Sequence, residues 1–200
     1  MLKVGLTGSI AVGKSFVCEV LREVGAFVLD ADRTAREVVA RGSKGLALIE
    51  EKFGREVLTE SGELDRVKMA EIVFADEAKR QLLNSIVHPL VFEAQNAWLE
   101  EKERENIHGI AVIDAALMIE SGGYKRFTKL IVVWCEPEIQ LQRLMLRNNL
   151  TEAEAFKRIE AQMPQEEKKL YADFLIDTSE GFENTRKRTV EVFEELKLLN

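Results

Sequence analysis

Five short runs of apolar, largely β-branched residues mark the chain, at residues 4–7, 26–29, 110–113, 130–134 and 174–176. None alternates with polar residues, which is typical of parallel strands covered on both faces. Segments with apolar residues at helical spacing separate the runs, and another follows the last run at residues 184–199. The pattern therefore predicts an α/β fold, with a five-stranded parallel sheet flanked by helices.

Two intervals interrupt this alternation. The first, between the second and third runs, contains five helical patterns, at residues 33–40, 46–53, 65–74, 77–86 and 89–104. We expect Asp65 to cap the third of these and Pro89 to open the last. The interval is far too long for a simple crossover, so it predicts a helical insertion at residues 33–107 in a core of residues 1–32 and 108–200. The second interval contains helical patterns at 137–147 and 151–162, with Thr151 and Glu154 spaced as a capping box.

A phosphate-binding motif follows the first run. Residues Gly8-Ser-Ile-Ala-Val-Gly13-Lys14-Ser15 fit GxxxxGK(S/T), and a helical pattern comes directly after them. Glycines let the backbone wrap a phosphate with its N–H groups pointing inward, and the helix adds its positive end. Lys14 is expected to reach the β- and γ-phosphates and the Ser15 hydroxyl to bind Mg²⁺. The motif predicts a P-loop NTPase fold.

Acidic residues follow each of the other four runs, with Glu136 after the run at 130–134. Ligands of open parallel sheets bind beyond the carboxyl ends of the strands, so Asp30, Asp32, Asp114 and Asp177 are candidates for the same crevice. A carboxylate there can hold Mg²⁺ or accept a proton from an attacking hydroxyl. Asp30 could equally cap the helix that follows, and so, with less support, could Asp32; Asp114 could be the polar end of a buried strand.

Three further residues are candidates for contacts with substrate or phosphate. Arg143 and Arg147 are four residues apart on one expected helix, so they share a face and could reach a γ-phosphate or lie on a solvated surface. His88 precedes Pro89, and a lone histidine is more often structural than catalytic. We keep His88 only as a candidate contact of the helical insertion.

Composition limits the class of protein. The chain has 200 residues and a net charge of −7, and this excess of acidic residues argues against general nucleic-acid binding. Its two cysteines are far apart, without the spacing of a disulfide framework or metal cluster. No apolar run approaches the length of a membrane span, so we expect a cytoplasmic protein without a membrane partner.

These motifs together resemble the dephospho-coenzyme A kinase family, over most of the chain. Beyond the phosphate-binding loop, the resemblance rests on five blocks: Val28-Leu-Asp-Ala-Asp32, Ile86-Val-His-Pro-Leu90, Asp114-Ala-Ala-Leu-Met-Ile-Glu120, Gln140-Leu-Gln-Arg-Leu-Met-Leu-Arg147 and Arg158-Ile-Glu-Ala-Gln-Met-Pro164. The loop departs from the usual family pattern, because Ala11 and Val12 stand where glycine and serine are common.

The resemblance implies a reaction in which ATP, with Mg²⁺, phosphorylates the ribose 3′-hydroxyl of dephospho-coenzyme A. The insertion would be the substrate lobe, and a small helical lid would lie within about residues 137–165. The catalytic residues would be Asp32, Lys14 and Arg143. The substrate would contact Asp32 and, on its coenzyme A side, His88. The candidates for Mg²⁺ binding are Ser15 and Asp114. The nucleotide would contact Gly8, Ala11, Val12, Gly13, Lys14, Ser15, Phe16 and Arg147.

Two alternatives remain open on the sequence. One is another P-loop kinase acting on a nucleoside monophosphate or small polyol, which would share the loop and lid but not the acceptor. The other is a nucleotide-binding module without turnover. A GTPase is disfavoured because the chain has no late Asn-Lys-x-Asp segment. Oligomeric state is not predicted.

Overall fold

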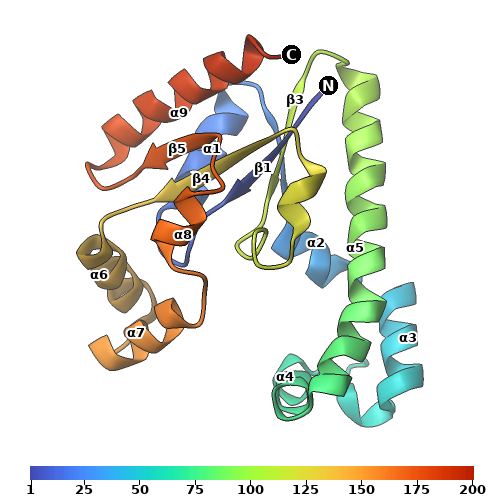
Figure 1. Ribbon diagram of the computed structural model, residues 1–200. Helices are drawn as coiled ribbons and strands as arrows, with labels where there is room; N and C mark the ends of the chain where they lie inside the picture. The colour runs from blue at the N-terminus through green and yellow to red at the C-terminus, as the bar shows by residue number, and fades with distance from the viewer. The chain divides into compact units, whose positions relative to one another are not determined.

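The computed structural model describes residues 1–200 and is built on one five-stranded sheet whose order is β2-β3-β1-β4-β5 (Figure 1). All paired strands are parallel. The strands are β1 (Leu2–Thr7), β2 (Phe27–Asp30), β3 (Ile110–Asp114), β4 (Lys129–Trp134) and β5 (Phe174–Asp177). Each lies within two residues of its expected bounds, which confirms the predicted sheet.

Helices make up most of the remaining chain. They are α1 (Lys14–Glu23), α2 (Ala31–Glu37), α3 (Lys44–Phe53), α4 (Arg66–Ala75), α5 (Glu77–Glu105), α6 (Pro137–Asn148), α7 (Glu152–Glu160), α8 (Gln165–Lys169) and α9 (Phe182–Lys197), with short 3₁₀ turns η1 (Arg55–Val57) and η2 (Gly123–Arg126). The structure confirms both predicted caps. Asp65 accepts from the Lys68 N–H at 3.0 Å, and Thr151 with Glu154 forms the full capping box at the start of α7.

The chain divides into two compact units. The first consists of Met1–Asp30 and Lys102–Asn200 and contains the sheet, and the second is Ala31–Glu101 and is helical. In the sheet unit, α1 and α9 pack together over one face of the sheet (Figure 1). Their apolar residues join those of β1, β3 and β4 in one core, which includes Val4, Val17, Leu21, Ile131 and Leu196. This packing fixes the start of α1, and therefore the loop before it, against the central strand.

The second unit corrects one prediction. We expected helices at 77–86 and 89–104 with Pro89 at a first turn, but α5 runs unbroken through Pro89. Proline in a helix interior removes one backbone hydrogen bond, which disfavours this arrangement locally. Apolar side chains on both sides of Pro89 pack within the unit: Val87 joins its core, and Leu90 lies beside Gly45 of α3. Tertiary packing thus outweighs the local cost and keeps the helix continuous.

None of the helices combines the length and the apolar character that crossing a membrane requires.

Candidate active site

The loop between β1 and α1 has the geometry that its glycines suggest. A Cβ on Gly8 would lie 2.5 Å from the Val133 carbonyl oxygen of β4, so only glycine allows this close approach. Gly13 caps α1 with φ +86°, in the left-handed region that glycine adopts without strain. The loop is therefore held tightly against the carboxyl end of β4.

Lys14 and Asp114 form an ion pair at the carboxyl ends of the central strands. Asp114 ends β3 and is the strand partner of Leu6 in β1, so it stands beside the phosphate-binding loop. The Lys14 side chain is 17 % exposed and that of Asp114 is 12 % exposed. The pair is thus largely shielded from water without being fully buried.

Cys18 donates to the second oxygen of the Asp114 carboxylate, with Sγ and Oδ2 separated by 3.4 Å. Burial raises the pKa of the Cys18 thiol well above its ordinary range, and the negative charge of Asp114 raises it further. The thiol therefore stays protonated and acts as a donor. Lys14 and Cys18 together fix the orientation of the Asp114 carboxylate.

Arg143 of α6 reaches the loop through Thr178, the residue after β5. Its two terminal nitrogens donate to the Thr178 hydroxyl and carbonyl oxygens, each at 2.8 Å. The Thr178 hydroxyl in turn donates to the Val12 carbonyl at 2.7 Å. Arg143 is half-buried, whereas Arg147 is exposed and donates to the side chain of Asn148 at 2.9 Å. Arg143, but not Arg147, is therefore tied to the phosphate-binding loop.

Polar side chains that the sequence analysis did not single out surround the tip of this loop. Gln140 and Gln162 bind the backbone of Ile10, and the Ser9 hydroxyl donates to the Met163 carbonyl at 3.5 Å. The two glutamines lie in sequence blocks that carry the family resemblance, but nothing in their spacing marks them as partners of a loop more than a hundred residues away.

A buried lysine holds the segment that follows Asp114. The Lys168 side chain is 1 % exposed and pairs with Glu120 at 2.8 Å. Its ammonium group also donates to the Ala116 carbonyl at 2.9 Å, and the Thr7 hydroxyl donates to the same oxygen at 3.1 Å. Lys168 of α8 therefore anchors residues 114–120 beside the end of β1.

Asp32 and His88 belong to the helical unit. Asp32 is exposed and is the second residue of α2, where a carboxylate interacts favourably with the helix dipole. It is two residues beyond the end of β2, the strand whose last residue, Asp30, pairs in register with Asp114. His88 is exposed on α5, with its ring centroid 6.3 Å from that of Phe92.

Two oxygen donors near Lys14 are of the kind that can hold a magnesium ion. The exposed Ser15 hydroxyl and the Asp114 carboxylate are hard oxygen ligands of the kind that Mg²⁺ prefers. No group of three or more histidine, cysteine or acidic side chains is arranged to hold a metal ion.

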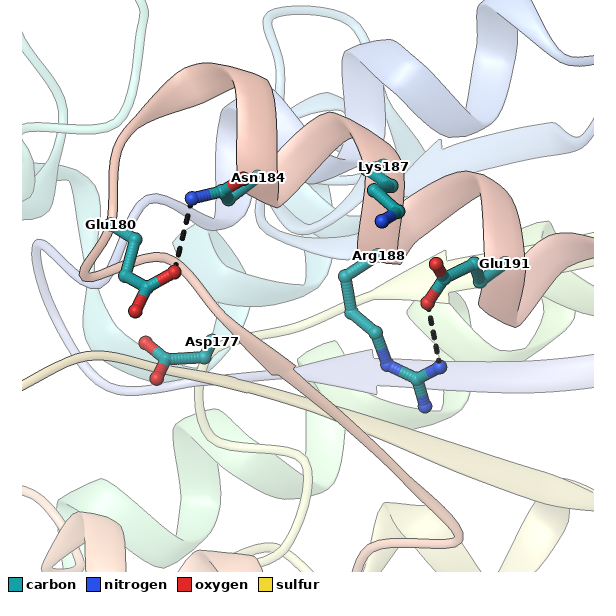
Figure 2. A pocket seen from close by; sticks show the side chains of 6 residues that line it. All are labelled: Asp177, Glu180, Asn184, Lys187, Arg188 and Glu191. Carbon is teal, nitrogen blue, oxygen red and sulfur yellow. Dashed lines mark hydrogen bonds and ion pairs between the residues drawn. The ribbon is translucent and has the colours of Figure 1, made fainter.

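A separate shallow hollow of about 250 Å³ lies along β5 and α9 (Figure 2). Its side chains are charged or polar, and several pair with one another. Glu180 accepts from Asn184 at 3.0 Å and Glu191 accepts from Arg188 at 3.3 Å (Figure 2). The remaining lining residues are Asp177 and Lys187. Because charges of both signs line this hollow, it lacks the positive character of the phosphate-binding loop.

Comparison with known proteins identifies the relatives of this chain. A family model described as "Dephospho-CoA kinase" matches residues 2–184. The dephospho-CoA kinase of Listeria monocytogenes serotype 4b is 44 % identical over 189 residues, covering 94 % of this chain and 93 % of the relative. That of Bacillus cereus strain ATCC 14579 is 48 % identical over 174 residues, covering 87 % and 86 %.

Solved structures agree with these sequence matches. A Thermus thermophilus protein, TT1252, superimposes with a TM-score of 0.80 at 31 % identity, covering 98 % of this chain and 97 % of the other. A dephospho-CoA kinase from Campylobacter jejuni gives a TM-score of 0.65 at 26 % identity, with 96 % of each chain covered. A shikimate kinase from Acinetobacter baumannii, at 16 % identity and a TM-score of 0.51, covers 98 % of this chain and 93 % of the other and shares the fold.

Proposed function

The chain belongs to the dephospho-coenzyme A kinase family, and from this premise we propose that it transfers the γ-phosphoryl group of ATP to the ribose 3′-hydroxyl of dephospho-coenzyme A. The products are coenzyme A and ADP, and the reaction is the last step of coenzyme A biosynthesis.

The observation that best supports this proposal is the set of cations around the loop between β1 and α1. Lys14 lies beside Asp114 at the start of α1, and Arg143 is tied to the loop through Thr178. The hydrogen bonds of Arg143 go to neutral oxygens of Thr178, so they do not neutralise its positive charge. Two cations at the loop can stabilise the negative charge that spreads over the γ-phosphoryl group during transfer.

In the proposed mechanism, the 3′-oxygen of the acceptor attacks the γ-phosphorus as the bond to the β-phosphate oxygen breaks. Asp32 accepts the proton of the attacking hydroxyl, and ADP leaves with the electron pair of the broken bond. The backbone N–H groups between Gly8 and Ser15 cradle the phosphates. Arg147 provides a further contact to ATP from the helical segment 137–165, which we assign as the lid.

The helical unit, Ala31–Glu101, is assigned as the substrate lobe, with His88 on the side of the coenzyme A moiety. Mg²⁺ bound by Ser15 and Asp114 would supply positive charge at the β- and γ-phosphates.

We place the protein in the cytoplasm, in keeping with two buried cysteines that form no disulfide.

A panel of acceptors tests this function. The protein would be assayed for ADP release with ATP, Mg²⁺ and, in turn, dephospho-coenzyme A, nucleoside monophosphates and shikimate. We expect turnover with dephospho-coenzyme A to exceed turnover with every other acceptor. Preferential turnover of a nucleoside monophosphate would reject the assigned substrate, and ATP binding without turnover of any acceptor would reject the kinase assignment.

A further inference from the structure

The backbone of Ile10, in the phosphate-binding loop, is bound from both sides by glutamine side chains. Its N–H donates to Oε1 of Gln162, just beyond α7, at 2.8 Å. Its carbonyl accepts from Nε2 of Gln140, on α6, also at 2.8 Å. The peptide groups on either side of Ile10 therefore have a fixed orientation relative to α6 and α7.

A third glutamine fixes the direction of these bonds. The Cys135 N–H donates to Oε1 of Gln165 at 3.1 Å, and Nε2 of Gln165 donates to Oε1 of Gln140 at 2.8 Å. A backbone N–H can only donate and a carbonyl can only accept, so each amide has one workable orientation. We call Gln140, Gln162 and Gln165 the glutamine bracket.

The bracket lies next to a strained position. Ala11 has φ +62°, in the left-handed region that costs a residue with a Cβ about 1–3 kcal/mol. Such a conformation persists only where the surroundings determine it. Gln140 is only 2 % exposed, so its hydrogen bond to Ile10 is shielded from competing water.

We propose that Gln140 and Gln162 are positioning residues, which hold the loop in the conformation that binds the phosphates of ATP. Gln165 supports them by fixing the amide of Gln140. The inference rests on the proposed function in one respect, since it takes ATP as the ligand of the loop. If the bracket only stabilised the fold, its loss would lower the melting temperature without changing ATP affinity in the folded protein.

The direction of the bonds provides the test. Gln140→Glu replaces the donor to the Ile10 carbonyl with an acceptor, whereas Gln162→Glu keeps an acceptor for the Ile10 N–H. Both variants add one negative charge at hydrogen-bonding distance from Ile10. An effect of charge alone would therefore lower ATP affinity to a similar extent in both. Gln142→Glu, at an exposed position of the same helix, is the matched control.

The dissociation constant of ATP would be measured by calorimetry without acceptor, alongside the melting temperature of each variant. We expect Gln140→Glu to raise this constant about tenfold or more, because it leaves a buried carbonyl unpaired. Gln162→Glu should raise it less than about threefold, and Gln142→Glu should match the wild type. Equal losses for Gln140→Glu and Gln162→Glu would overturn the proposal.

Gln140→Met removes the donor without adding charge and covers the case in which Gln140→Glu does not fold. It should also weaken ATP binding, and wild-type affinity in folded Gln140→Met would overturn the proposal. Because no acceptor is present, the test is separate from that of the kinase reaction. A protein inactive on dephospho-coenzyme A but with the expected differences in ATP affinity would reject the assigned reaction and keep the bracket.

Discussion

At the scale of single residues, the candidate active site contains charged groups whose neighbours fix their direction. Asp114 is fixed by Lys14 and by the protonated Cys18 thiol. Arg143 is fixed by the neutral oxygens of Thr178, which leave its charge available to a phosphate. These contacts orient the side chains, and preorganisation of this kind is a main source of electrostatic stabilisation in phosphoryl transfer.

Arg143→Ala should lower kcat by about 10³–10⁵, the range typical of an arginine that stabilises charge on a transferring phosphoryl group. Arg147 is exposed and lies four residues further along the same helix. Arg147→Ala should lower kcat by about tenfold or less, because the Arg147 guanidinium keeps contact with water. Steady-state kinetics with saturating ATP would measure both. A loss below tenfold for Arg143→Ala would reduce it to a structural link between α6 and Thr178.

Asp32→Asn should lower kcat by about 10²–10⁴ and leave ATP affinity close to that of the wild type, because the carboxylate acts on the acceptor hydroxyl. Turnover would be measured by ADP release and ATP affinity by calorimetry. Unchanged turnover would mean that Asp32 serves only to stabilise the first turn of α2.

The two thiols should resist alkylation in the folded protein. Burial raises the pKa of both Cys18 and Cys135, so neither is ionised near pH 8, and the thiolate is the reactive form. The same shifts predict that stability falls as pH rises above the ordinary thiol pKa, since only the unfolded state then loses its thiol protons. Labelling with iodoacetamide, followed by mass spectrometry, should be slow until denaturant is added. Rapid labelling of either cysteine in native protein would contradict this.

At the scale of elements, the strands and caps could be predicted because their signals are local. The apolar runs gave the five strands, and Asp65 and Thr151 cap helices as their spacing indicates. The interior position of Pro89 could not be predicted, because packing on both sides of it decides the outcome. The bonds from Gln140 and Gln162 to Ile10 were also missed, since hydrogen bonds between distant segments leave no periodic pattern.

Two neighbouring lysines of α8 should differ sharply in their contribution to stability. Lys168→Met breaks a buried ion pair and leaves Glu120 without its cation, so we expect a loss of about 2–4 kcal/mol in the free energy of unfolding. Lys169 pairs with the exposed Glu166, and its ammonium nitrogen lies 3.4 Å from the centre of the Trp134 ring. Lys169→Met should therefore cost only about 1 kcal/mol. Urea denaturation would compare the variants, and equal losses would contradict the role of Lys168.

At the scale of the whole molecule, each compact unit contains residues to which the proposal assigns a role. The sheet unit contains Lys14 and Arg143, whereas the helical unit contains Asp32 and His88. A long helical interval between two strands predicts a helical insertion, at residues 33–107. The acceptor was not visible in any single motif, because the phosphate-binding loop specifies only phosphates. Its identity is inferred from the family to which the chain belongs.

The most direct test of this account is the position of the phosphoryl group in the product. The protein would be incubated with ATP, Mg²⁺ and dephospho-coenzyme A, and the product analysed by ³¹P NMR and mass spectrometry, with a 3′-deoxyribose analogue as the control acceptor. We expect a single new phosphomonoester at the 3′-oxygen, formed in step with ADP, and no product from the analogue. Phosphorylation at another position, or of the 3′-deoxy analogue, would contradict it.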